Sequence, residues 1–253
     1  MFHEWTVARI VASSSFALLI AVSGSAVGQQ SGTPRADTAR NISTRPGSAP
    51  AVGNVDLAKS RAFIFVGKTG LGHDHGVEGQ LSAGNINLGA KQQCGSLVFD
   101  MKSFDADTPT ARKYVSLEGT TDASTRKKVN DNMKGSAVLD VERHPTARFD
   151  IQSAIPIEQR SSRGNPVYQL SGNFTLHGVA RPIRFNAEAV AQQGATRLRG
   201  GFAIRQSDFG IKPFTKAFGA VGVADELKIY GDIVLVQRAS VANTATNRNG
   251  EQR

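Results

Sequence analysis

The residues best suited to chemistry form the short run His73-Asp74-His75. Imidazole nitrogens and carboxylate oxygens are common ligands of transition metals. The two histidines are two positions apart, so on a strand both side chains point to the same face. A metal site normally needs three or four ligands, and His144 and His177 complete this one only if the fold brings them near. The run lies among glycines, so the sequence favours a polar turn here, and we predict no metal ligands.

Catalytic motifs give no support for an enzyme. The sequence contains neither the Gly-x-Ser-x-Gly nucleophile elbow nor the His-Glu-x-x-His zinc motif. Asp208 and Asp225 lie near expected loops, and Asp208 is better explained by pairing with Arg205 or by capping a turn than by acting as a base. We therefore predict no catalytic residues. An isomerase- or cyclase-like enzyme that acts on an apolar substrate inside a β-barrel remains an alternative.

Alternation of apolar and polar residues indicates the elements that must position these groups. The clearest case is residues 168–189, where two alternating segments flank the turn His177-Gly178. Such alternation is typical of strands with one apolar face, and glycine adopts turn conformations at little cost. Similar short strands with turns between them occur from residue 55 to residue 237. This pattern predicts an all-β barrel or sandwich.

Residues 106–134 interrupt the strand pattern. Thr108 followed by Pro109 is typical of a helix start, because proline is favoured in the first helical turn. Asp122 can cap a second helix, and Gly135 can end it. We predict one or two short helices that lie outside the barrel or across its mouth.

The two ends of the chain differ in composition from the rest. Residues 1–28 contain the short apolar core and small residues of a signal peptide, with an uncleaved membrane anchor as the alternative. Residues 29–54 are rich in Ser, Thr, Pro, Gly, Ala and Arg, so we predict a flexible linker, and residues 238–253 are predicted to be a disordered tail. One domain, residues 55–237, remains, in a protein that we expect to be periplasmic or secreted.

Charge and cysteine content narrow the range of partners. The formal net charge is +9, which can favour anionic surfaces. The basic residues are not interleaved with aromatic ones, as binding of single-stranded nucleic acid requires. We expect no nucleic-acid partner and at most a transient contact with a membrane surface. The single cysteine, Cys94, excludes an internal disulfide and is expected to be buried.

Three segments resemble motifs of the YceI-like family. Residues 172–183, Gly-Asn-Phe-Thr-Leu-His-Gly-Val-Ala-Arg-Pro-Ile, resemble its G-x-L-T-L-x-G-V-T-x-P hairpin. Residues 144–149, His-Pro-Thr-Ala-Arg-Phe, resemble its P-x-x-x-F strand entry, and residues 202–211 resemble its F-x-I-x-R-S-D-F-G-I segment with Gln206 inserted. The resemblance implies an exported, antiparallel up-and-down barrel of about eight strands, similar to lipocalins. It also implies that the barrel holds a long apolar lipid, such as a polyisoprenoid chain.

A barrel of about eight strands is either filled by side chains or holds one small ligand. Glycines at Gly172 and Gly200 are expected to leave room near the axis, and the Phe-rich segment 209–222 suits a mobile apolar flap over the mouth. The alternative is that these phenylalanines plug a solid barrel end. The predicted ligand-binding residues are Phe63, Phe65, Phe149, Tyr168, Leu170, Phe174, Leu176, Phe185, Phe202, Ile204, Phe209, Phe214 and Phe218.

The sequence and the resemblance together predict a lipid-binding protein whose partner is a long-chain apolar lipid. Apart from a bound isoprenoid lipid we predict no cofactor, and the oligomeric state stays open. The main alternative is a metal- or small-molecule-linked stress protein that uses His73 and His75.

Overall fold

The structure, a computed structural model, describes residues 51–237. The predicted signal peptide, the predicted tail and most of the predicted linker lie outside the described residues. Ala51–Val55, at the end of the predicted linker, forms the first strand, β1. The last strand ends at Gln237, where the predicted domain also ends.

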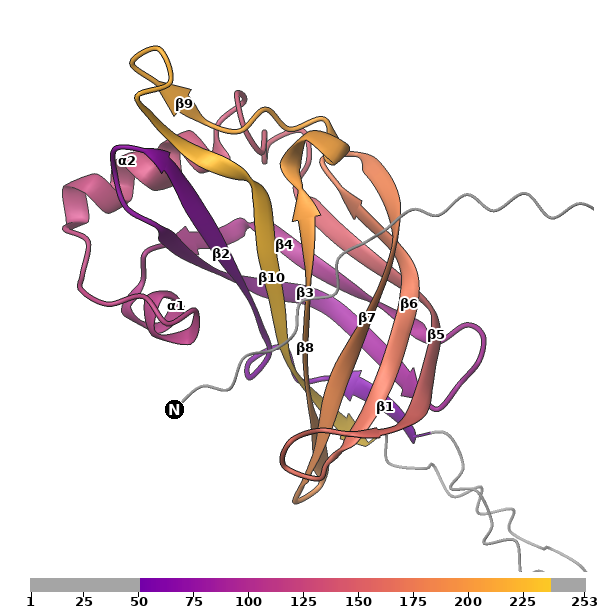
Figure 1. Cartoon of the computed structure of the whole chain (residues 1–253). Helices are drawn as coiled ribbons and strands as arrows, with labels where there is room; N and C mark the ends of the chain where they lie inside the picture. Colours follow the sequence, from indigo (N-terminus) through magenta and orange to yellow (C-terminus); the bar gives the residue numbers. More distant parts are fainter. Residues whose placement is uncertain (1–50, 238–253) are drawn as a thin grey trace, which may run out of the picture. The chain divides into compact units, whose positions relative to one another are not determined.

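The fold is a closed antiparallel barrel of eight strands, as predicted (Figure 1). Each barrel strand pairs with its neighbour in the chain, and the last one, β10, pairs with both β8 and β2 and so closes the wall. The short strands β1 and β9 (Thr215–Lys216) pair with β10 outside this ring. The barrel strands are β2 (Arg61–Gly70), β3 (His75–Leu88), β4 (Gly95–Ala106), β5 (Thr146–Arg160), β6 (Pro166–Leu176), β7 (Val179–Gln192), β8 (Ala195–Arg205) and β10 (Val221–Gln237).

The hairpin of β6 and β7 forms as the alternation predicts. Its two turn residues, His177 and Gly178, have φ values of 52° and 77°, the left-handed pair that a type I′ turn requires. Leu176 pairs with Val179 across this turn, and Phe174 is buried on the inner face. The turn and the apolar face together fix the register, because a slip by one residue would expose the whole apolar set.

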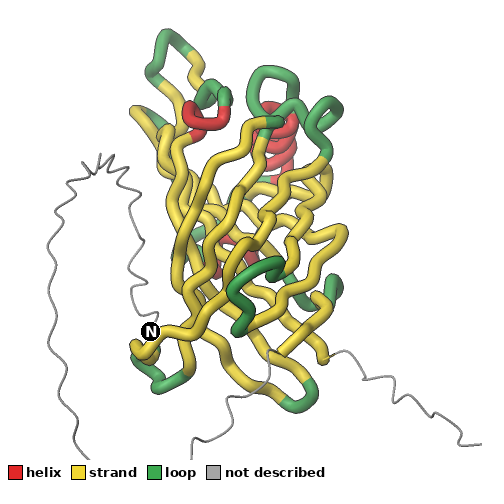
Figure 2. Tube along the Cα trace, turned by 90° about the vertical axis from the view of Figure 1, so that its right-hand side faces the viewer, coloured by secondary structure: helices red, strands yellow, loops and turns green. Residues whose placement is uncertain are grey.

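Two short helices separate β4 from β5, as predicted. The side chain of Thr108 accepts a hydrogen bond from the Ala111 amide at the start of α1 (Pro109–Tyr114). The side chain of Asp122 caps α2 (Ala123–Lys134) in the same way, and Gly135 follows its last turn. Figure 2 shows that strands make up most of the described chain and that the helices are short. In Figure 1 the two helices lie outside the strand wall, and α2 lies towards the end of the barrel that carries β9. No helix within residues 51–237 is both long and apolar enough to cross a membrane.

The two glycines expected to leave room near the axis do so only in part. A Cβ atom at Gly172 would overlap the carbonyl oxygen of Asp150 on β5, so glycine is needed there for close strand approach. Gly200 does line the cavity, but a Cβ atom would lie 2.7 Å from the carbonyl oxygen of Asn186. The expectation is therefore wrong for Gly172.

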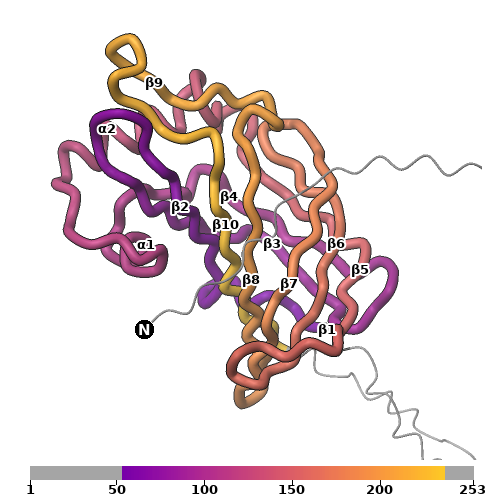
Figure 3. Tube along the Cα trace, in the orientation of Figure 1, coloured from indigo at the N-terminus to yellow at the C-terminus, as the bar shows by residue number. Residues whose placement is uncertain are grey.

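The core of the barrel is formed by inward-facing side chains of all eight barrel strands. Cys94 is fully buried and unpaired, as expected for a small apolar residue. The trace in Figure 3 shows how β10 runs beside β2 and β8 along the wall. At one end the strands enclose a cavity.

Candidate functional site

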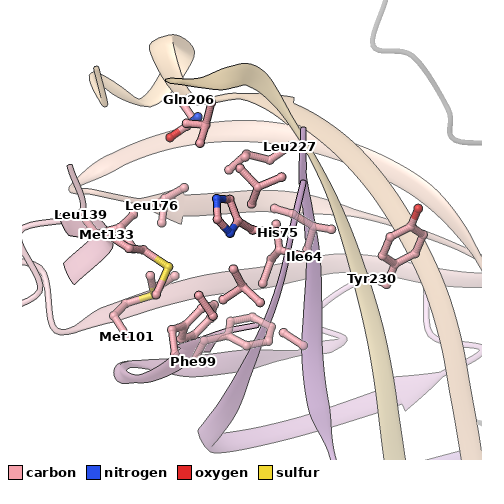
Figure 4. A pocket seen from close by; sticks show the side chains of 18 of the residues that line it. Ile64, His75, Phe99, Met101, Met133, Leu139, Leu176, Gln206, Leu227 and Tyr230 are labelled. Atoms are coloured by element: carbon pink, nitrogen blue, oxygen red, sulfur yellow. The ribbon is translucent and has the colours of Figure 1, made fainter. Parts of the chain in front are cut away.

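The barrel holds an apolar cavity of about 410 Å³ (Figure 4). Its wall comes from every barrel strand and from α2, and it extends to the barrel end formed by the turn between β2 and β3, by β9 and by α2. We call this end the mouth and define it by Leu71, His73, Lys128, Lys216 and Val221, which belong to these segments and line the cavity. A volume of this size suits one small or chain-like ligand.

Many of the predicted ligand-binding residues do line this cavity. Phe202 lies at the centre of an aromatic cluster, with its ring centroid 5.5 Å from that of Phe174 and 5.1 Å from that of Phe185. Such tilted and edge-on arrangements are favourable for aromatic rings. The predicted residues in the lining are Phe149, Leu170, Phe174, Leu176, Phe185, Phe202 and Phe214.

Phe63 and Phe65 lie on the outer face of β2, so the prediction that they line the cavity is wrong. Phe63 stacks on Tyr114 of α1, with the ring centroids 3.7 Å apart. The ammonium group of Lys228 lies 5.5 Å from the centroid of the Phe65 ring. Residues 62–66 are apolar at every position, so alternation could not decide which face is inward. The residues of β2 that line the cavity are Ala62, Ile64 and Val66.

The remaining predicted residues are dispersed. Tyr168 is partly buried against the core, and Ile204 is buried, but neither lines the cavity. In the expected flap, Phe209 is buried in the core, Phe214 lines the cavity and Phe218 is fully exposed. The segment therefore neither folds over the mouth as one unit nor plugs the barrel with all three rings.

Sequence reasoning missed several lining residues from other strands and from α2. Val129 and Met133 line the cavity. Their spacing of four predicts one face of a helix, but they were not among the predicted ligand-binding residues. Gln206, the residue inserted relative to the family motif, also lines it, while its Nε2 donates a 2.8 Å hydrogen bond to the carbonyl oxygen of Ala224. Other lining residues missed in this way are Phe99, Met101, Leu139, Leu227 and Ile229.

A polar cluster of His73, His75 and Asp107 lies at the mouth. Oδ2 of Asp107 lies 2.7 Å from Nδ1 of His75 and 3.3 Å from Nε2 of His73. The Asp107 side chain is fully buried, whereas 44% of the His73 side chain is exposed. Both histidines line the cavity, and Figure 4 shows His75 among its side chains.

The other carboxylate oxygen of Asp107 is held from two sides. Oδ1 accepts a 3.1 Å hydrogen bond from Nη1 of Arg112 and a 3.2 Å bond from the Gly76 amide. Burial opposes ionisation of this carboxyl group. Hydrogen bonds from His75, His73 and the Gly76 amide, with the charge of His75, outweigh that effect and hold the pKa of Asp107 well below its usual range.

His144 and His177, the partners that the sequence offered for this cluster, lie elsewhere and pair with each other. Their ring centroids are 4.3 Å apart, and neither belongs to the group of ligand atoms around Asp107. The third member of the cluster is instead Asp107, which the sequence did not indicate. Asp208, whose pairing with Arg205 was expected, forms no ion pair within residues 51–237, and its carbonyl oxygen accepts a bond from Arg181.

Comparison with known proteins places most of the described chain in one domain type. A family model described as a YceI-like domain matches residues 54–235. A UPF0312 protein of Azotobacter vinelandii is 31% identical over 117 residues, which cover 44% of this chain and 58% of that protein. A UPF0312 protein of Pseudomonas syringae pv. tomato is 32% identical over 117 residues, with the same coverage. The match thus spans less than two thirds of these relatives.

Solved structures show similar chains at low identity. The crystal structure of Burkholderia cenocepacia BcnA aligns with a TM-score of 0.46 and 19% identity, over 71% of this chain and 98% of that one. The crystal structure of a Campylobacter jejuni YceI protein aligns with a TM-score of 0.39 and 11% identity, over 57% of this chain and 72% of that one.

Proposed function

The chain belongs to the YceI-like family, and we propose that it is a lipid-binding protein that holds a long, polyisoprenoid-like apolar chain inside its barrel. The observation that carries this proposal is the apolar cavity of about 410 Å³. Its wall consists mainly of aliphatic and aromatic side chains from all barrel strands, with polar groups concentrated near the mouth. A ligand with a long apolar body and a small polar end matches this distribution.

Such a ligand can be bound mainly by burial of its apolar surface, with few hydrogen bonds or charges. Moving one methylene group from water into an apolar site is worth about 0.8 kcal/mol. A ten-carbon segment therefore gains roughly 8 kcal/mol before the costs of lost chain freedom and of association. The aromatic cluster around Phe202 offers flat, weakly polar surface along which an unsaturated chain can pack. We accordingly propose a binding role without catalysis.

The residues at the mouth favour a lipid bilayer as the place where the ligand is taken up or released. Leu71 and Val221 line the opening of the cavity, and both are exposed. Lys128 and Lys216 line the same opening, so a cationic, apolar rim surrounds the entrance. Such a rim is suited to anionic lipid headgroups with acyl chains beneath them. We propose a transient membrane contact by an exported protein, in keeping with the signal peptide that the sequence predicts.

The direct experiment identifies what the purified protein contains. Untagged protein, purified without added ligand, is extracted with organic solvent, and the extract is analysed by mass spectrometry. We expect one long-chain apolar lipid per barrel, and we expect lipid-free protein to bind a fluorescent polyprenol. If neither a lipid in the extract nor saturable binding of the polyprenol is found, lipid binding is disproved and the barrel is a scaffold for another function.

A further inference from the structure

We propose that His73, His75 and Asp107 form a binding site for a divalent transition-metal ion of the Zn²⁺ type at the mouth of the cavity. One ligand atom from each residue lies within 4.8 Å of the other two. Two imidazoles and one carboxylate are a ligand set typical of zinc sites with an open position. The site is distinct from the apolar wall that carries the proposed lipid binding.

The distances are close to those that an ion needs. Ligands at about 2.0–2.1 Å in a tetrahedral site are roughly 3.3 Å apart. The 3.3 Å between Nε2 of His73 and Oδ2 of Asp107 already matches this value. The 2.7 Å between Nδ1 of His75 and Oδ2 of Asp107 is a hydrogen-bond distance, so these two atoms must move apart by a few tenths of an ångström before both can coordinate one ion. Coordination through Nδ1 would require a His75 ring whose proton is on Nε2.

The surroundings of Asp107 fix one oxygen and leave the other for the ion. Arg112 and the Gly76 amide both bond to Oδ1, and Arg112 is itself held by the carbonyl oxygens of Glu118 and Gly119. Groups that orient a ligand in this way are typical of metal sites. Asp107 also has a left-handed φ of 56°, a conformation that costs energy and often occurs at functional sites.

Charge balance alone does not explain the cluster. The Arg112 guanidinium neutralises the buried carboxylate but bonds only to Oδ1, so Oδ2 needs one donor of its own. His75, at 2.7 Å, supplies it, and the second imidazole of His73 is not needed for this purpose. His73 is partly exposed, and its ring could turn to water without leaving a buried group unpaired. The convergence of both rings on one oxygen gathers three ligand atoms around a point that a cation could occupy, in place of the two hydrogen bonds.

The ion would have a free coordination position towards the cavity. Three protein ligands leave a fourth position for water or another ligand, and both histidines line the cavity. A hydroxyl, carbonyl or anionic end of a bound lipid could take that position. This last consequence rests on the proposed lipid binding, whereas the metal site itself does not.

The test uses untagged full-length protein that has been treated with EDTA and dialysed. Titration with Zn²⁺ is followed by calorimetry, and Co²⁺ is used to record the visible absorption of a tetrahedral site. The main variant is His73→Ala, because this exposed side chain can be removed without disturbing the buried carboxylate. The matched control is His144→Ala, which removes a histidine from the other close pair. Asp107→Asn is a second variant, and circular dichroism checks that each protein is folded.

We expect one Zn²⁺ per chain in the wild type and in His144→Ala, and at least a tenfold weaker affinity in folded His73→Ala. The Co²⁺ spectrum should be lost with the affinity. The proposal is overturned if the wild type binds no stoichiometric metal, or if His144→Ala weakens binding as much as His73→Ala does. Because polyprenol binding is measured separately on metal-free protein, a protein that binds Zn²⁺ but no lipid disproves only the lipid-binding function.

Discussion

The backbone amide of Leu71 donates a 2.9 Å hydrogen bond to the carbonyl oxygen of Ala220. This bond ties the turn between β2 and β3 to the hairpin of β9 and β10, and a bridge from Leu71 to Val221 reinforces it. Leu71 is 71% exposed, and Phe218 at the tip of the same hairpin is fully exposed. The link therefore keeps three exposed apolar side chains, those of Leu71, Phe218 and Val221, at the same end of the barrel.

The exposed ring of Phe218 should anchor the protein to lipid. Phe218→Ser should lower partitioning onto vesicles of mixed phosphatidylglycerol and phosphatidylcholine about tenfold or more, because burying a phenylalanine side chain is worth about 1.5–3 kcal/mol. Co-sedimentation with the vesicles measures the effect. The matched control is Leu57→Ser, since Leu57 is also exposed but precedes β2 at the opposite end of the barrel. An equal loss in both variants would show that the mouth has no special role.

Leu176→Trp should separate a ligand cavity from a solid core. Leu176 lines the cavity, so a tryptophan ring can occupy the space that we propose for a lipid. We expect loss of polyprenol binding with little change in the free energy of unfolding of lipid-free protein, measured by urea denaturation. Thr175→Trp, on the opposite face of β6, is the control and should keep binding. Destabilisation of Leu176→Trp by about 1–3 kcal/mol or more would instead indicate overpacking of a filled core.

Gly172→Ala should destabilise the barrel, because the added methyl group would overlap the carbonyl oxygen of Asp150 and push β5 away from β6. We expect a loss of about 1–3 kcal/mol in the free energy of unfolding. Gly67→Ala on β2 is the matched control, since its nearest atom, Cβ of Ala224, would lie at an ordinary contact distance of 3.5 Å. Chemical denaturation of both variants checks this, and equal stabilities would contradict the steric argument.

The lowered pKa of Asp107 should make the free energy of unfolding depend on pH. Its pKa is lowered in the folded state from an ordinary value of 3.8, so its ionised form stabilises the fold above that pH. This contribution is lost as pH falls through 3.8 towards the lower pKa of the folded state. In EDTA, the melting temperature of the wild type should therefore fall more steeply than that of Asp107→Asn below about pH 5. At pH 7 the variant should be less stable by about 1.5–3 kcal/mol. Parallel pH curves for the two proteins would show that Asp107 does not contribute in this way.

The sequence alone was sufficient to predict the strands that have one apolar and one polar face. The hairpin at His177 and Gly178 could be predicted because polar residues alternate with apolar ones and the turn residues accept left-handed φ. The inner face of β2 could not, because Phe63 and Phe65 are as apolar as the residues between them. Phe63 can point outward because Tyr114 of α1 stacks on its ring. The alternation of apolar and polar residues within a strand does not reveal that a helix packs on its outer face.

The cluster of His73, His75 and Asp107 could be predicted only in part, because its third member, Asp107, follows a different strand, β4. Asp107 lies 32 positions after His75 in the chain. The register of β3 with β4 pairs Val77 with Ala106 and so brings Asp107 next to Gly76. That register includes shifts along the strands, which periodicity does not reveal. His73 and His75 could be singled out from their types, whereas their partner required the pairing.

The position of β10 in the wall has a consequence for how the protein is made. This strand closes the ring by pairing with β2 on one side and β8 on the other, and it is the last strand of the domain. During synthesis, β2 has no permanent neighbour on that side until nearly the whole domain has left the ribosome. Pairing across so long a stretch of chain is slow. The closed cavity therefore comes into existence only after translation of the domain is complete.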